Sequence, residues 1–145
     1  MLADTLARRG YQLVEFGKET DLLVLNTCSV TENAEKDCRY AVRKTLRHSP
    51  HAFVAVTGCY AQTVPGSDLI VGTQFKMNLP DYRPAPAKLR KQPEPELRHS
   101  RTIDREDFVL PGTAYSDSTR ALLKIQDGCD FMCSFCLIPF ARGRE

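Results

Sequence analysis

The sequence predicts an α/β fold in which a small parallel sheet fills the first part of the chain. Helix-like and strand-like patterns alternate there at short intervals, which is typical of βαβ units. The strand-like runs are apolar throughout, as in parallel strands that are buried on both faces. A proline-rich linker and the beginning of a second unit follow. We expect these three parts to span residues 1–78, 79–114 and 115–145.

The first expected helix and strand lie at the start of the chain. Leu2 and Leu6 are spaced for one face of a helix, and Gly10, which follows two arginines, is typical of a helix end. Residues 21–26 form a short apolar run that predicts a strand buried on both faces.

A longer amphipathic helix and two more strands follow. Ser29 and Glu32 have the spacing of a capping box, and apolar residues recur at three- and four-residue steps across 34–46. The apolar runs 53–57 and 69–72 predict the second and third strands.

The segment from 79 to 95 holds five of the nine prolines, mixed with lysine and arginine. Proline fixes φ and has no N–H to donate, so we expect neither helix nor sheet to continue there. Residues 120–125 predict a strand that runs into a loop rich in cysteine. Too little chain follows for an independent core, so we expect the second unit to be cut short. The first helix likewise has no strand before it.

Composition narrows the class of protein. The 145 residues are 42% hydrophobic and 26% charged, which is typical of a globular domain and not of a disordered tail or a coiled coil. The net charge of +2 gives no case for a strongly basic nucleic-acid binder, although it does not exclude one. Without a signal-peptide pattern or a long apolar run, we expect a cytoplasmic protein with no membrane segment. Clustered cysteines in that compartment more often mean metal binding or catalysis than disulfides.

Three cysteines near the end of the chain form the sharpest pattern. Cys129, Cys133 and Cys136 have the spacing CxxxCxxC, which can bring three thiolates to one iron–sulfur cluster and leave one iron without a protein ligand. Zinc with a distant fourth ligand and unligated thiols are the alternatives that the spacing leaves open. Phe135 lies between the last two cysteines, where it could stack on a base or pack the loop.

Two further cysteines follow the ends of expected strands. Cys28 and Cys59 come directly after the first and second strand, and ligands bind beyond the carboxyl ends of the strands in parallel α/β sheets. Each could instead be a small buried hydrophobic residue, and the sequence favours neither interpretation. Cys38 lies on the apolar stripe of its helix, which favours core packing.

The helix across 34–46 and its continuation also carry several basic side chains. Such a face is usually just solvated, so contact with RNA is the less favoured interpretation. The basic residues are Lys36, Arg39, Arg43, Lys44 and Arg47.

Three segments resemble one known family. Residues 123–144, LKIQDGCDFMCSFCLIPFARGR, closely resemble the cluster loop of the radical S-adenosylmethionine methylthiotransferases. Residues 26–31, NTCSVT, and 56–62, VTGCYAQ, resemble two of the three cysteine motifs in the N-terminal domain of that family. Within the family, the sequences of these motifs are most similar to the MtaB-type branch, which acts on N6-threonylcarbamoyladenosine in tRNA. The MiaB-type branch, which acts on isopentenyladenosine, is the nearest alternative.

The resemblance implies roles for the residues of the cluster loop. Cys129, Cys133 and Cys136 would hold a [4Fe–4S] cluster whose open iron binds S-adenosylmethionine, and Phe135 would lie beside the adenine of that cofactor. The loop would open a radical S-adenosylmethionine (β/α) barrel, of which this chain contains the first strand and the cluster loop.

For the N-terminal domain, the resemblance implies that Cys28 and Cys59 hold an auxiliary [4Fe–4S] cluster. That cluster would carry the sulfur or methylthio group that is inserted at C2 of an adenosine next to the anticodon of tRNA. The partners would be the tRNA substrate and an electron donor such as flavodoxin or ferredoxin. No side chain is assigned a catalytic role beyond holding these groups.

The sequence departs from the family in what it lacks. The first cysteine motif, the rest of the barrel and the C-terminal RNA-binding domain are absent, so we expect this chain to be an inactive piece of a larger transferase. A zinc-stabilised module that binds RNA or protein is the competing hypothesis from another class.

Overall fold

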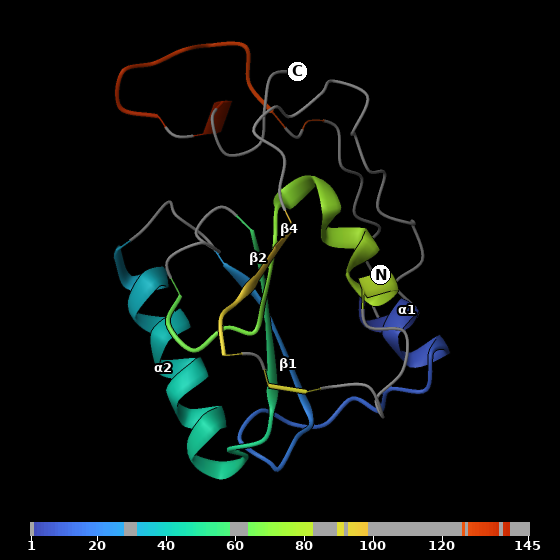
Figure 1. The fold of residues 1–145 in the computed structure, drawn as a ribbon. Helices are drawn as coiled ribbons and strands as arrows, with labels where there is room; N and C mark the ends of the chain where they lie inside the picture. The colour runs from blue at the N-terminus through green and yellow to red at the C-terminus, as the bar shows by residue number, and fades with distance from the viewer. Residues whose placement is uncertain are drawn as a thin grey trace, which may run out of the picture.

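A four-stranded parallel sheet forms the centre of the computed structural model (Figure 1). Its strands are β1 (Leu22–Thr27), β2 (Phe53–Gly58), β3 (Leu69–Val71) and β4 (Glu96–Arg98), and they lie side by side in that order. The structure describes residues 2–27, 32–58, 64–82, 90–91, 93–98, 126, 128–136 and 138–139.

Apolar side chains point to both faces of the sheet and bury the inner strands β2 and β3, whereas β1 is half-buried and β4 is mostly exposed. β1 and β2 pair over six residues, from Leu22 opposite Phe53 to Thr27 opposite Gly58. Successive side chains of a strand alternate between faces, so an apolar run must be covered on both sides. The predicted strands 21–26, 53–57 and 69–72 are therefore confirmed, each to within a residue at its ends.

One face of the sheet is covered by the long helix α2 (Glu32–His48). Its apolar stripe contributes Val42 and Leu46, which pack against alternate residues of β2 and against β3. The predicted amphipathic helix is confirmed. The core on this face contains Val42, Val54, Val56, Val64 and Ile70, with Leu23, Leu25 and Leu46 packed against it.

The other face is covered by α1 (Leu2–Arg8), the 3₁₀ helix η2 (Thr73–Asn78) and the single turn α3 (Leu79–Tyr82). The guanidinium of Arg9 joins α1 to α3, because it donates to the Pro80 carbonyl at 3.0 Å and forms an ion pair with Asp81. The core on this face contains Phe53, Ala55, Leu69, Val71 and Leu79, with Leu2, Leu22, Val24, Phe75 and Tyr82 packed against it.

The expectation that no helix or sheet continues beyond residue 79 differs from the structure. Pro80 lies in the first turn of α3. Backbone N–H groups in a first turn have no acceptor within the helix, so the missing N–H of proline costs no hydrogen bond there. Pro95 comes directly before β4. The N–H of Glu96, the first residue of that strand, donates to the Asp68 carbonyl at 2.9 Å. Pro80 therefore lies within α3, whereas Pro93 and Pro95 precede β4, and the sheet gains a fourth strand that the sequence did not predict. The domain boundaries at 78 and 114 stay a prediction.

A buried carboxylate ties three strands together. Asp68 is 2% exposed, and its Oδ2 accepts from the backbone N–H of Val54 at 2.8 Å and from Nζ of Lys91 at 2.9 Å. The backbone of Asp68 also bonds to Val54 and to Glu96. This residue therefore links β2, the start of β3 and the approach to β4.

Within the described residues, no helix is both long enough and apolar enough to cross a membrane. The strand predicted at 120–125 lies outside the residues that the structure describes.

Candidate functional site

The carboxyl end of the sheet brings two cysteine motifs to neighbouring strands. Thr27, the last residue of β1, lies opposite Gly58, the last residue of β2. Cys28 and Cys59 each follow one member of this pair in the chain, although both lie outside the described residues. Adjacent strands are about 4.8 Å apart, so the two cysteine-bearing segments leave the sheet from neighbouring points.

Gly58 is required at this edge by its conformation and by its neighbours. Its φ is +103°, a value that residues with a Cβ rarely adopt. A Cβ placed on Gly58 would also lie 2.3 Å from the carbonyl oxygen of Thr27. The ends of β1 and β2 therefore approach too closely for any side chain at this position.

Two threonines complete the edge. The hydroxyl of Thr27 donates to the carbonyl of Thr57 at 2.9 Å, and Thr27 is only 4% exposed. Thr57 is fully buried, yet its Oγ1 has no hydrogen-bond partner among the described residues. An unpaired buried hydroxyl is costly, and this one lies two residues before Cys59. It leaves a spare O–H donor at the sheet edge where the cysteine motifs begin.

The second cysteine group is held on a short surface loop. The N–H of Cys136 donates to the carbonyl of Cys133 at 3.0 Å, and Nε2 of Gln126 donates to the carbonyl of Gly128 at 3.2 Å. Cys129 and Cys136 are half-buried and Cys133 is exposed, and all three are free thiols. None of the three residues is fully buried.

The donor set of this loop fits a thiolate-held cluster, although the loop is open. No group of three His, Cys, Asp or Glu side chains in the described part of the chain lies close enough to hold a metal ion. Three free thiols within eight residues nevertheless match the soft ligands that iron–sulfur clusters take. The loop must draw its sulfurs together to hold a cluster.

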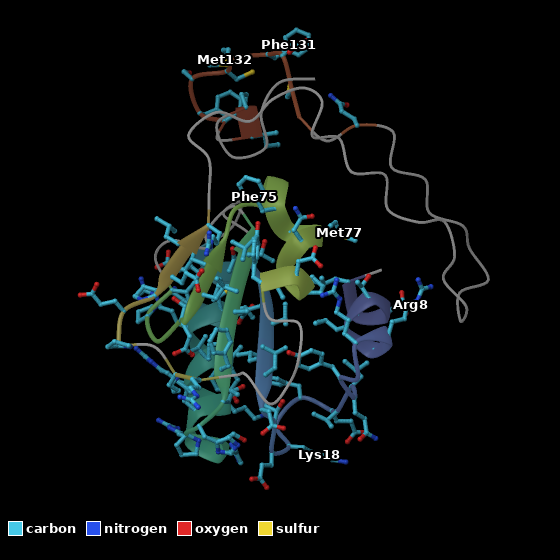
Figure 2. All side chains as sticks on the ribbon, turned by 45° about the vertical axis from the view of Figure 1, so that its right-hand side comes forward. Arg8, Lys18, Phe75, Met77, Phe131 and Met132 are labelled. Carbon is cyan, nitrogen blue, oxygen red and sulfur yellow. The ribbon has the colours of Figure 1, made fainter. Side chains whose placement is uncertain are left out.

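Three large apolar side chains of the same loop are exposed. Phe135 is 90% exposed, Phe131 77% and Met132 51%. The alternative in which Phe135 packs within the loop does not describe this structure, because the ring is almost wholly in solvent. Figures 1 and 2 both show residues 128–136 beyond the end of the sheet at which the strands terminate.

Cys38 is a core residue, as its place on the apolar stripe of the helix predicted. It is 7% exposed and lies on α2, among the buried apolar residues. Sequence reasoning did not single out Thr57. The available signal was a hydroxyl at the end of the otherwise apolar run 53–57, next to the glycine that precedes Cys59.

Comparison with known proteins finds one matching family and many relatives. Residues 1–75 match the family described as "Uncharacterized protein family UPF0004". The threonylcarbamoyladenosine tRNA methylthiotransferase MtaB of Bacillus subtilis (strain 168) is 38% identical over 144 residues, covering 92% of this chain and 31% of that protein. The protein of the same name from Aquifex aeolicus (strain VF5) is 34% identical over 155 residues, covering 99% and 36%.

A relative with a different name matches over as much of the chain. The tRNA-2-methylthio-N(6)-dimethylallyladenosine synthase of Rickettsia rickettsii (strain Sheila Smith) is 32% identical over 167 residues, covering 99% of this chain and 35% of that protein. The chain thus spans about a third of the length of these curated relatives. No solved structure matches the chain.

Proposed function

Because this chain belongs to the UPF0004 family, we propose that it forms part of a radical S-adenosylmethionine tRNA methylthiotransferase. The reaction we propose inserts a methylthio group at C2 of N6-threonylcarbamoyladenosine, next to the anticodon of a tRNA. The observation that carries the proposal is the pairing of Thr27 with Gly58, from which two cysteine motifs leave one sheet edge. The two relatives named threonylcarbamoyladenosine tRNA methylthiotransferase MtaB support this choice of substrate.

The proposed roles of the cysteines follow their two locations. Cys129, Cys133 and Cys136 hold one [4Fe–4S] cluster, and Cys28 and Cys59 contribute two ligands to a second. When bound and reduced, the cluster held by Cys129, Cys133 and Cys136 would supply one-electron chemistry for cleavage of the sulfonium of S-adenosylmethionine.

The protein's own contribution is to position these groups and to exclude water. The exposed ring of Phe135 is available to lie against the adenine of S-adenosylmethionine. The rigid edge at Thr27 and Gly58 fixes where the segments of Cys28 and Cys59 begin. The unpaired hydroxyl of Thr57 is a donor suited to a thiolate or sulfide sulfur. The proposal also includes a flavodoxin- or ferredoxin-type electron donor and a cytoplasmic location.

Anaerobic reconstitution with iron and sulfide tests the cofactor assignment. We expect broad visible absorbance that dithionite bleaches. Stoichiometric binding of colourless zinc in its place would favour the competing interaction module.

Cysteine substitutions in the protein produced from its native gene test the two-cluster assignment. The double substitution Cys28→Ser/Cys59→Ser should remove about four iron atoms per chain, which is one cluster. Cys38→Ala is the matched control, because that thiol is packed in the core, and it should leave the iron content unchanged. Unchanged iron in the double variant would remove the basis for sulfur insertion.

A dimethylallyladenosine-type substrate is the second candidate, since a relative with that printed name matches 99% of the chain. Mass spectrometry of tRNA nucleosides from cells that lack the gene separates the two. Loss of methylthio-threonylcarbamoyladenosine supports our proposal, whereas loss of the methylthio derivative of isopentenyladenosine supports the second candidate.

A further inference from the structure

The outer face of α2, away from the sheet, carries a basic groove. The groove encloses about 540 Å³ and runs along one side of the helix for about 18 Å, given a rise of about 1.5 Å per residue. Figure 2 shows nitrogen-tipped side chains gathered along this helix. The lining residues are Lys36, Arg39, Tyr40, Arg43, Lys44, Arg47 and His48.

Positive charge in this groove is only partly balanced. α2 carries five lysine and arginine side chains against three carboxylates, and no carboxylate follows Asp37 on the helix. Arg39 pairs with Glu35 at 2.5 Å. Arg43 and Arg47, in contrast, make no ion pair within the described part of the chain.

Stabilisation of the helix by a cation at its carboxyl end accounts for the charge of only one of these two arginines. Arg47 lies in the last turn, where a cation stabilises the negative end of the helix dipole. Arg43 lies a full turn earlier, and the dipole effect falls off within the last turn. Neither an ion pair in the described residues nor the helix dipole therefore accounts for the charge of Arg43.

Exposed aromatic rings border the same groove. Tyr40 is 61% exposed and Phe16, on the neighbouring segment, is 55% exposed. Nζ of Lys44 lies 4.8 Å from the centre of the Phe16 ring and 5.9 Å from that of Tyr40, which holds the rings in place. Glu15 beside Phe16 pairs with Lys18 at 3.0 Å. Cations interleaved with exposed rings are the combination that binds nucleic-acid strands, since phosphates meet the cations and bases stack on the rings.

The groove starts close to the candidate site. α2 begins at Glu32, only four residues after Cys28, so its first turns lie near the carboxyl end of the sheet. The basic side chains then continue from Lys36 to Arg47, away from that edge. A strand bound along the groove would therefore lead away from the sheet edge that carries the cysteine motifs.

We propose that this groove binds the phosphodiester backbone of an RNA strand, with phosphates at Arg43 and Arg47 and a base against Tyr40. The two arginines are one helical turn apart, with Cβ atoms about 6 Å from each other, so both can reach neighbouring phosphates. In identifying the RNA as the tRNA substrate, the inference rests on the proposed function.

Binding of an unmodified tRNA transcript to the 145-residue chain, prepared without iron, tests the groove independently of the clusters. The slope of log affinity against log salt concentration should flatten by about 1.5 in Arg43→Ala/Arg47→Ala, because each lost phosphate contact removes about 0.7–0.9. At about 0.1 M salt the affinity should fall about tenfold.

Three single variants provide the matched comparison. Arg8→Ala removes an exposed helical arginine from α1, on the opposite face of the sheet (Figure 2), and should leave both affinity and slope unchanged. Arg43→Ala should flatten the slope by about half as much as the double variant. Tyr40→Ala should weaken binding about fivefold with an unchanged slope, because stacking releases no counterions.

The outcomes separate this proposal from the proposed function. Equal losses in Arg8→Ala and Arg43→Ala, or an unchanged slope in the double variant, would overturn the groove while leaving the cluster assignment intact. Binding of a polyglutamate peptide but not of tRNA would overturn it in favour of an acidic protein partner. Groove-dependent binding in a protein that takes up zinc and no iron would support the groove and reject the transferase.

Discussion

At the residue scale, Gly58 shows how the strand ends constrain the candidate site. Two separate restrictions meet there: a left-handed backbone and a Thr27 carbonyl oxygen within 2.3 Å of any added Cβ. Gly10 shares the first restriction, with φ +90°, but an added Cβ there would meet nothing within 4 Å. The two glycines therefore allow the contribution of the close approach to be measured.

We expect Gly58→Ala to lower the free energy of unfolding by about 3 kcal/mol or more, because it adds a backbone clash to the conformational strain. Gly10→Ala should cost only about 1 kcal/mol, from strain alone. Urea unfolding measures both, and equal losses would show that the approach of Thr27 to Gly58 is looser than described.

Thr57 and Thr27 form a second matched pair. Replacing the unpaired hydroxyl in Thr57→Val should stabilise the iron-free chain by about 1 kcal/mol, since a buried donor without a partner is removed. Thr27→Val should destabilise it by about 1 kcal/mol, because a satisfied hydrogen bond to the Thr57 carbonyl is lost. Thermal unfolding would reveal the opposite signs; destabilisation by Thr57→Val would mean that its hydroxyl has a partner.

Single residues also mark the limit of what the sequence predicts about the site. The spacing of Cys129, Cys133 and Cys136 and the positions of Cys28 and Cys59 after strands can be read from the chain alone. The need for glycine at 58 cannot, because the clash arises only when β1 and β2 are paired in this register.

At the element scale, β4 depends on interactions that are distant in sequence. It is three residues long, and its N-terminal hydrogen bond goes to the backbone of Asp68, whose carboxylate also binds Val54 and Lys91. Composition alone indicated a linker, because the prolines before Glu96 outweigh any local strand signal. Tertiary pairing with β3 decides the outcome. Helix α2 was predicted because its periodicity extends over several turns.

Removing the Asp68 carboxylate should weaken this part of the sheet. We expect Asp68→Ala to lower the free energy of unfolding by about 2–4 kcal/mol, because the Val54 N–H becomes a buried donor without an acceptor and Lys91 loses its ion pair. Glu94→Ala, at an exposed position of the same approach to β4, should change it by less than about 0.5 kcal/mol. Denaturant titration would contradict the prediction if the two variants lost similar stability.

At the scale of the whole molecule, the two groups of cysteines differ in how they connect to the core. Cys28 and Cys59 follow directly in the chain after β1 and β2, two paired strands whose apolar side chains pack into both cores. Cys129, Cys133 and Cys136 lie on a loop outside the paired strands, where the N–H of Cys136 donates to the carbonyl of Cys133. Iron bound by the first group should therefore stabilise the sheet, and iron bound by the second should not.

Thermal unfolding after reconstitution measures this difference in the protein produced from its native gene. A ligand at about 100 times its Kd stabilises the folded state by about 2.7 kcal/mol. A triple Cys→Ser variant of the loop at 129, 133 and 136 should retain the rise in Tm of the sheet domain, whereas Cys28→Ser/Cys59→Ser should abolish it. The reverse pattern would mean that the loop cluster, and not the auxiliary one, is coupled to the sheet.

The order of the strands leaves the two borders of the sheet unequal. β4 is short and carries the charged residues Glu96 and Arg98. Short length and charged side chains at a sheet edge both discourage pairing with a strand of another molecule. β1 is twice as long and largely aliphatic, and no described strand covers its outer side. Self-association of concentrated protein should accordingly begin along β1, so a lysine at Asn26, the exposed residue of that strand, is the rational way to keep purified material dispersed.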